Sequence, residues 1–156
     1  MERIKKILAP TDMSEFSEAG VRYALDLART VGAEVTIYYV LSTDELMQQD
    51  LVGPLSHILE KYEQALRKFL DERFSDIIPL VEVRTKVEIG APDDNIVQEA
   101  EKGGMDMIVL STHGRTGLSH ILVGSVTERV VRHAPCPVLS IRPKGAGGAK
   151  IAAAAA

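Results

Sequence analysis

The sequence predicts an α/β protein built on an open, five-stranded, mostly parallel sheet with helices on both faces. Short apolar segments rich in β-branched residues alternate along the chain with segments of helical periodicity. Met107 to Leu110 is apolar without alternation, which is typical of a central parallel strand covered on both faces. Strands and helices that alternate in this way form right-handed βαβ units.

The first half of the chain predicts two strands and two helices. Residues 6–10 and 34–41 have strand composition, and residues 11–14 supply helix-capping side chains between them. Gly32 is placed to end the first helix. The apolar positions of the predicted helices are Val21, Ala24, Leu25, Ala28 and Val31 in the first, and Ile58, Leu59, Tyr62, Ala65, Leu66, Phe69 and Leu70, which mark one face, in the second. Residues 42–54 are expected to form a long polar connection with a functional role.

The second half predicts three strands and two helices. Residues 81–89 alternate strictly between apolar and charged side chains, which places this strand at a sheet edge with one face in water. Pro92 begins the third helix, and residues 103–104 end it with two glycines. Residues 125–133 are predicted to be the fourth helix and residues 137–141 the fifth strand.

Length and composition indicate one globular domain, assigned to residues 1–144 of the 156. Residues 145–156 are low-complexity and are assigned to a tail outside the fold. A formal charge of −4 disfavours a nucleic-acid partner, and no apolar run has the length of a membrane span. The single cysteine, Cys136, excludes an intramolecular disulfide and fits a packing role. We expect a cytoplasmic protein.

A glycine-containing loop, S-T-H-G-R-T-G-L-S-H-I-L-V-G-S, occupies residues 111–125 between the predicted central strand and the fourth helix. The chain has neither the G-x-x-x-x-G-K-[ST] phosphate loop nor a G-x-G-x-x-G motif after its first strand. Ligands of open parallel sheets bind beyond the carboxyl ends of the strands, near the point where the strand order reverses. The loop follows such a strand end and leads into a helix N-terminus, where phosphate binds readily.

Four motifs along residues 3–143 resemble the universal stress protein family. They are P-T-D at residues 10–12, S-T-H-G at 111–114, G-S-V-T-E at 124–128 and A-P-C-P-V-L at 134–139. Nucleotide-binding members of that family carry G-x2-G-x9-G-[ST] after the fourth strand. Ser111 stands where this motif has its first glycine, and serine does not adopt positive φ at glycine's low cost.

The resemblance implies a Rossmann-like fold of the adenine nucleotide alpha hydrolase type that binds ATP, ADP or AMP, with Mg²⁺ on the phosphates and no protein side chain assigned to the metal. The nucleoside would lie near Thr11, Asp12, Val40 and Leu110, and the phosphates near the glycine loop. The complete implied set is Pro10, Thr11, Asp12, Val40, Leu110, Ser111, Gly114, Gly124, Ser125, Val126 and Thr127.

Several of these residues also have a purely structural interpretation. Ser125 and Glu128 match a capping box, which would satisfy the helix N-terminus without a ligand. Asp12 could cap the first helix, although Ser14 is an equally good cap. Leu110 fits a core position, and His113 is expected to be a solvated loop histidine. The four histidines lack the spacing of a metal site, and we assign no phosphate role to Arg129.

The last strand suggests a homodimer. Residues 138–141 are apolar, whereas the opposite edge strand carries four charges, so the last strand is the less protected edge. The family resemblance also implies dimerisation. Three functions therefore remain open: a dimeric, ATP-binding stress-response regulator or sensor that acts on an unknown protein partner, a slow ATP hydrolase, and an interaction module that has lost nucleotide binding.

Overall fold

The computed structural model describes residues 2–49, 53–113, 123–143 and 151–154. One sheet runs through it in the strand order β3-β2-β1-β4-β5-β6. Five of its strands are parallel: β1 (Lys6–Pro10), β2 (Glu34–Ser42), β3 (Glu82–Gly90), β4 (Met107–Ser111) and β5 (Val138–Ile141). The predicted five-stranded parallel sheet is confirmed, and β4 lies inside it between β1 and β5 as expected.

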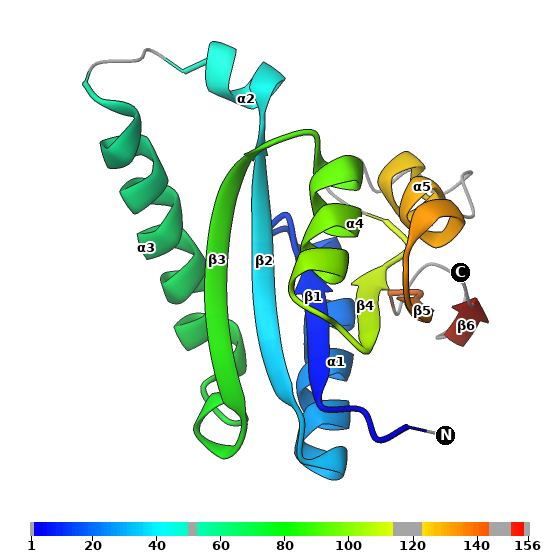
Figure 1. Cartoon of the computed structure of the whole chain (residues 1–156). Coiled ribbons are helices and arrows are strands. Elements are labelled where there is room, and N and C mark those ends of the chain that lie inside the picture. Colours follow the sequence, from blue (N-terminus) through cyan, green and yellow to red (C-terminus); the bar gives the residue numbers. More distant parts are fainter. Residues whose placement is uncertain (1, 50–52, 114–122, 144–150, 155–156) are drawn as a thin grey trace.

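Helices cover both faces of the sheet (Figure 1). Side chains of α1 (Glu18–Val31) and α3 (Leu55–Phe74) pack on one face, and those of α4 (Pro92–Lys102) and α5 (Ser125–His133) pack on the other. Two 3-10 turns, η1 (Glu15–Ser17) and η2 (Ile78–Leu80), precede α1 and β3. As predicted, Gly32 ends α1 in the left-handed conformation, with φ of 72°.

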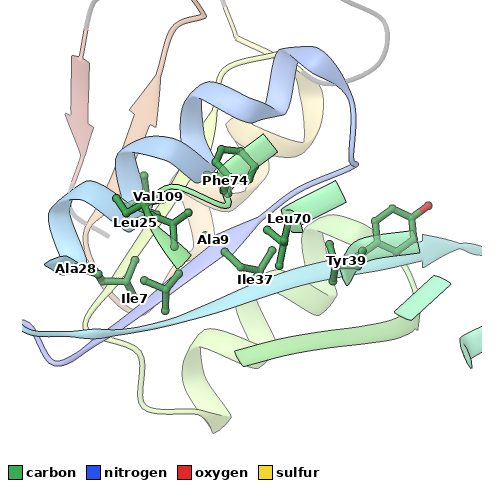
Figure 2. Close-up of a cluster of buried hydrophobic side chains, with 14 of the residues drawn as sticks. Ile7, Ala9, Leu25, Ala28, Ile37, Tyr39, Leu70, Phe74 and Val109 are labelled. Atoms are coloured by element: carbon green, nitrogen blue, oxygen red, sulfur yellow. The ribbon is translucent and has the colours of Figure 1, made fainter. Parts of the chain in front are cut away.

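The alternation of side chains along each strand divides the core into two clusters. Ile7, Ile37 and Val109 belong to the cluster under α1 and α3 (Figure 2), whereas their neighbours Leu8 and Ile108 belong to the cluster under α4 and α5. Both sets are buried because the inner strands are covered on both faces. The buried thiol of Cys136 packs in the second cluster, in the role that the sequence predicts.

The edge strand β3 has the two-faced character that its alternation predicts. Val87 is buried on the face that α3 covers, whereas Glu82, Arg84 and Lys86 are exposed. These exposed charges disfavour the pairing of a further strand at this edge of the sheet.

At the other edge, the sheet has a sixth strand that the sequence analysis does not predict. β6 (Ile151–Ala154) pairs antiparallel with β5, with Ile141 opposite Ile151 and Val138 opposite Ala154. These four residues lie in the segment that the sequence analysis assigns to a tail outside the fold. The apolar edge of β5 offers unpaired backbone groups, and a segment without proline or charge can pair with them.

A second difference lies in residues 42–54, which were expected to be a long polar connection and for which no helix was predicted. They contain the short helix α2 (Thr43–Met47), which begins with a capping box. Ser42 Oγ accepts from the backbone N–H of Glu45, and the Glu45 carboxylate accepts from the backbone N–H of Ser42. The S-T-D-E pattern at residues 42–45 is a capping-box signature that could have predicted this helix.

The strands separate at the point where their order reverses. β1 pairs with β2 along its whole length, up to Pro10 opposite Tyr38. Its pairing with β4 is registered only at Ile7 opposite Met107 and Leu8 opposite Ile108. The carboxyl ends of β1 and β4 are therefore not held together by a ladder, which is the place where open α/β sheets form their ligand crevice.

Helix α1 lies in close contact with β4 at Gly20. A Cβ on Gly20 would lie 2.6 Å from the backbone nitrogen of Ser111 and 2.8 Å from the carbonyl carbon of Leu110. The backbone N–H of Gly20 donates to Ser111 Oγ at 2.9 Å. Since this N–H belongs to the first turn of α1 and has no partner within the helix, the Ser111 hydroxyl satisfies it.

We predict that Gly20→Ala destabilises the protein by about 1–3 kcal/mol, because the added methyl group forces α1 away from β4. Urea unfolding followed by circular dichroism measures the change. Asp26→Ala, at an exposed position of the same helix, is the control and is expected to stay within about 0.5 kcal/mol of the parent protein. Equal stability of the two variants would contradict the prediction, because it would show that α1 shifts to accept the methyl group without a loss of unfolding free energy.

Candidate functional site

A cavity of about 640 Å³ opens at the carboxyl ends of β1, β2 and β4. The N-terminal residues of α4 and α5 and the first turn of α2 complete its wall. Its volume is within the range of small-molecule sites, and it lies at the reversal of strand order.

Every residue that the family resemblance implies for nucleotide binding lines this cavity, so far as the structure describes them. They are Pro10, Thr11, Asp12, Val40, Leu110, Ser111, Gly124, Ser125, Val126 and Thr127. Gly114 lies outside the described residues. Sequence reasoning missed further wall residues, which are Ser17, Tyr38, Tyr39, Ser42, Asp44, Glu45, Pro92, Ile96 and His113.

The N-terminus of α5 faces the cavity without a side-chain cap. Gly124, not Ser125, is the N-cap residue, and no side chain among the described residues caps this helix. The capping box proposed from the sequence is therefore wrong: the N–H of Glu128 donates to the Gly124 carbonyl, and the Glu128 carboxylate binds Arg132. The first N–H groups of α5 keep their capacity to donate, and the helix dipole makes this end attractive to an anion.

Gly124 is held close to the end of β4. Its N–H donates to the Thr112 carbonyl at 2.6 Å, and a Cβ on Gly124 would lie 3.0 Å from that oxygen. A glycine before the helix therefore serves a close approach of two backbone segments. This contact sets the position of the α5 N-terminus at the cavity.

Two hydroxyl groups of the predicted site make structural hydrogen bonds. Ser111 Oγ binds the N–H of Gly20, and Thr127 Oγ1 donates to the Ser111 carbonyl at 3.0 Å. Ser111 therefore joins α1, β4 and α5. Its side chain, which replaces the hydrogen of the family glycine, is directed to α1.

The loop after β1 is also ordered by its own side chains. Asp12 Oδ1 accepts from the backbone N–H of Ser14 at 3.0 Å, and Ser14 caps η1. Asp12 is therefore not the helix cap. Thr11 Oγ1 accepts from the N–H of Met13, whose φ of 61° is in the left-handed region that L-residues seldom adopt. Such strain is retained where the surrounding structure determines the backbone, which is common at ligand sites.

His113 differs from expectation because it is buried, with 7% of its surface exposed, and lines the cavity. Its Nδ1 lies 2.9 Å from Thr112 Oγ1.

Arg129 lies outside the cavity wall and binds Asp93 of α4 at 2.9 Å, so it links α4 to α5. This guanidinium lowers the pKa of Asp93.

A polar network supports the wall at Tyr38. The Tyr38 hydroxyl donates to Glu88 at 3.0 Å, and Lys86 lies 2.8 Å from Glu88 and 2.7 Å from Glu99. Burial raises the pKa of Tyr38 well above its usual value, and the charge of Glu88 raises it further. Lys86 in turn lowers the pKa of Glu88. The network keeps a neutral phenol beside a charged carboxylate.

The described wall of the cavity is acidic. It contains the carboxylates of Asp12, Asp44 and Glu45, and no lysine or arginine. Within the part of the chain that the structure describes, no cluster of three histidine, cysteine or acidic side chains could hold a metal ion. No helix in that part has the length and apolar character needed to cross a membrane.

The family model described as the universal stress protein family matches residues 3–142. The chain belongs to this family. It is 37% identical to the universal stress protein MJ0531 of Methanocaldococcus jannaschii over 144 residues, which cover 88% of this chain and 82% of that protein.

Solved structures of the family share the fold. MJ0577 from the same organism superposes with a TM-score of 0.72 at 30% identity, over 92% of this chain and 99% of that one. The universal stress protein UspA from Lactobacillus plantarum superposes with a TM-score of 0.73 at 27% identity, over 91% of this chain and 100% of that one. A family member solved in complex with cAMP gives 0.60 at 20% identity, over 90% of this chain and 98% of that one, which shows the shared fold alone.

We predict that the stability advantage of the parent protein over Tyr38→Phe decreases as the pH rises past 10. Tyrosine in the unfolded chain ionises near pH 10, whereas folded Tyr38 resists ionisation because its pKa is raised. Its contribution to stability is complete below pH 10 and falls above it. Urea unfolding of both proteins at about pH 8 and about pH 10.5 measures the difference. A constant difference would contradict the prediction.

Proposed function

We propose that the cavity binds an adenine nucleotide and that this universal stress protein acts as a nucleotide-dependent stress-response regulator. The observation that carries the proposal is the N-terminus of α5, which no described side chain caps and which opens into a cavity whose wall is partly apolar. A helix N-terminus binds phosphate through its N–H groups and its dipole. The structural alternative, a helix closed by its own capping box, is not what the described residues form.

The apolar part of the wall suits a planar base. Val40, Leu110 and Ile96 are each less than a tenth exposed, and all three line the cavity together with Pro92. A heteroaromatic ring that enters between them removes its faces from water while its edge remains available for hydrogen bonds. The base is therefore assigned to this wall and the phosphate chain to α5.

Mg²⁺ fits this assignment for an electrostatic reason. The described wall offers carboxylates and backbone N–H groups but no lysine or arginine to neutralise a triphosphate. A divalent cation carried by the phosphates would supply that charge. Asp12 follows β1, between the β2 and β4 ends, where the family resemblance places the nucleoside, so we assign no protein side chain to the cation.

We infer that the nucleotide acts by population shift. It contacts α5 and the residues around α2, so it stabilises the conformers in which these segments enclose it. The surface offered to a partner protein then depends on which nucleotide is bound.

We further propose a homodimer that pairs through β5. In the single chain, β6 already occupies the backbone hydrogen bonds along this edge, from Val138 to Ile141. A second copy can pair there only when β6 leaves. The two pairings therefore compete for the same edge.

We predict that Ser125→Pro weakens MgATP binding about 10- to 100-fold, because it removes an N–H donor to a charged group, worth about 1.5–3 kcal/mol. The fold should tolerate the change, since proline is favoured at the first helical position and Gly124 has the extended backbone, φ −68° and ψ 157°, that precedes proline well. Ser125→Ala keeps the N–H and is the matched control. Calorimetry measures affinity, and thermal melting checks the fold.

Mass spectrometry of the ligand released from denatured protein identifies a nucleotide that co-purifies. For ligand-free protein, saturation with MgATP at about 100 times Kd should add about 2.7 kcal/mol of stability. No released nucleotide and no stabilisation would overturn the proposal and favour an interaction module without nucleotide. Multiple-turnover release of phosphate would instead indicate the hydrolase.

We predict that removal of residues 145–156 raises the dimer fraction, because it deletes β6 and exposes the backbone edge of β5. Sedimentation velocity at several micromolar concentrations compares the truncated and full-length chains. A truncated chain that stays monomeric throughout this range would contradict pairing through β5.

A further inference from the structure

The two ends of the cavity differ in chemical character. One end is formed by Ser111 and the N-terminus of α5, where backbone N–H groups attract an anion. The other is formed by the carboxyl end of β2 and the first turn of α2, where Asp44 and Glu45 line the wall. Opposite polarity at two ends of one cavity selects a ligand that is anionic at one end and donates hydrogen bonds at the other.

The strand order sets the distance between these ends. β2 and β4 flank β1 on its two sides, and neighbouring strands lie about 4.8 Å apart, so the two strand ends are separated by roughly 10 Å. A single phosphate or a metal ion cannot reach both ends. A nucleotide, with phosphates on one side and a nucleoside on the other, has the required length.

The two carboxylates at the β2 end are not equivalent. Glu45 accepts from Ser42 in the capping box and from the Tyr39 hydroxyl at 3.4 Å. Asp44 is exposed, and among the described residues its carboxylate makes no hydrogen bond and no ion pair. Only its backbone carbonyl is used, by the N–H of Gln48. Asp44 is therefore the wall carboxylate whose acceptors face no protein partner.

We propose that Asp44 is a specificity-determining residue that reads the nucleoside end of the ligand. Its carboxylate accepts a hydrogen bond from a nucleoside donor, which is either a ribose hydroxyl or the exocyclic amine of the base. It also disfavours a second anionic group at that end, such as a phosphate on the ribose 3′ oxygen. This inference rests on the proposed nucleotide site.

The discrimination follows from the chemistry of an ionised carboxylate. It only accepts hydrogen bonds, so a ligand that lacks the donor leaves it without a partner. A ligand phosphate at the same place meets a like charge, which is the repulsive element that specificity requires. Helix α5 attracts an anionic group at one end of the cavity. Asp44 repels such a group at the other end, so the ligand is oriented with its phosphates at α5.

The experiment compares Asp44→Ala with Asp94→Ala. Asp94 is also an exposed carboxylate in the first turn of a helix that contributes to the wall, but Asp94 itself does not line the cavity. The two variants remove the same charge, so their difference isolates the contact. Calorimetry with Mg²⁺ measures the affinity of the parent protein and both variants for ATP, 2′-deoxy-ATP, 3′-deoxy-ATP and inosine triphosphate.

We expect Asp44→Ala to bind ATP about fivefold more weakly than Asp94→Ala, the size of one exposed hydrogen bond. The parent protein should bind one of the three analogues more weakly than ATP, by a similar factor. That difference in affinity should vanish in Asp44→Ala. A deoxy analogue would identify the ribose as the donor, and inosine triphosphate would identify the amine. The ratio of the affinities for AMP and adenosine 3′,5′-bisphosphate should also decrease in Asp44→Ala but not in Asp94→Ala.

Two results would overturn the inference. If both variants bind ATP equally, or if the analogue losses persist in Asp44→Ala, Asp44 does not read the nucleoside while the nucleotide site stands. If the parent protein binds none of the nucleotides, the proposed function itself fails, and the role of Asp44 fails with it. Thermal melting without ligand confirms that both variants are folded.

Discussion

The site depends on how β4 is held in the sheet beside β1. Their parallel pairing is registered at two positions only, beyond which the strand ends are free to flank a ligand. The backbone of β4 must nevertheless be held, since Ser111 and the start of α5 both depend on it. The ladder with β5 provides part of this, up to Ser111 opposite Ile141, and hydrogen bonds from outside the sheet add to it: Gly20 donates to Ser111 Oγ, and Thr127 donates to the Ser111 carbonyl.

This arrangement gives a physical account of the serine in the glycine motif. The hydroxyl of Ser111 is directed to α1, where it satisfies an N–H at the helix start, and not to the phosphate end of the cavity. Gly20 makes room for it, because a side chain there would collide with β4. The departure from the family pattern is thus matched by a contact on the neighbouring helix. Ser111 still lines the cavity.

Much of the candidate site was predictable because the motifs that resemble the family lie at strand ends and at a helix start, and these segments meet at the cavity. Helix α5 begins at Ser125, at the predicted residue, and the edge strand β3 exposes Glu82, Arg84 and Lys86, as its alternation predicts. The way in which α5 is capped could not be predicted from the sequence pattern. Ser125 and Glu128 have the right spacing, but the backbone of Gly124 is the cap, because its N–H is held by Thr112.

The sequence by itself determined the alternation of strands and helices, the two-faced edge strand and the family motifs, because these depend on local periodicity and residue type. Only the tertiary structure decided which side chains share the cavity. Asp44 and Ile96 come from segments outside the glycine loop, and the strand order together with the packing of α4 brings them to the same cavity. It also decided that β5 pairs with β6, since an edge strand accepts any segment that can reach it. Local patterns cannot specify such contacts, because they depend on distances between elements that are remote in sequence.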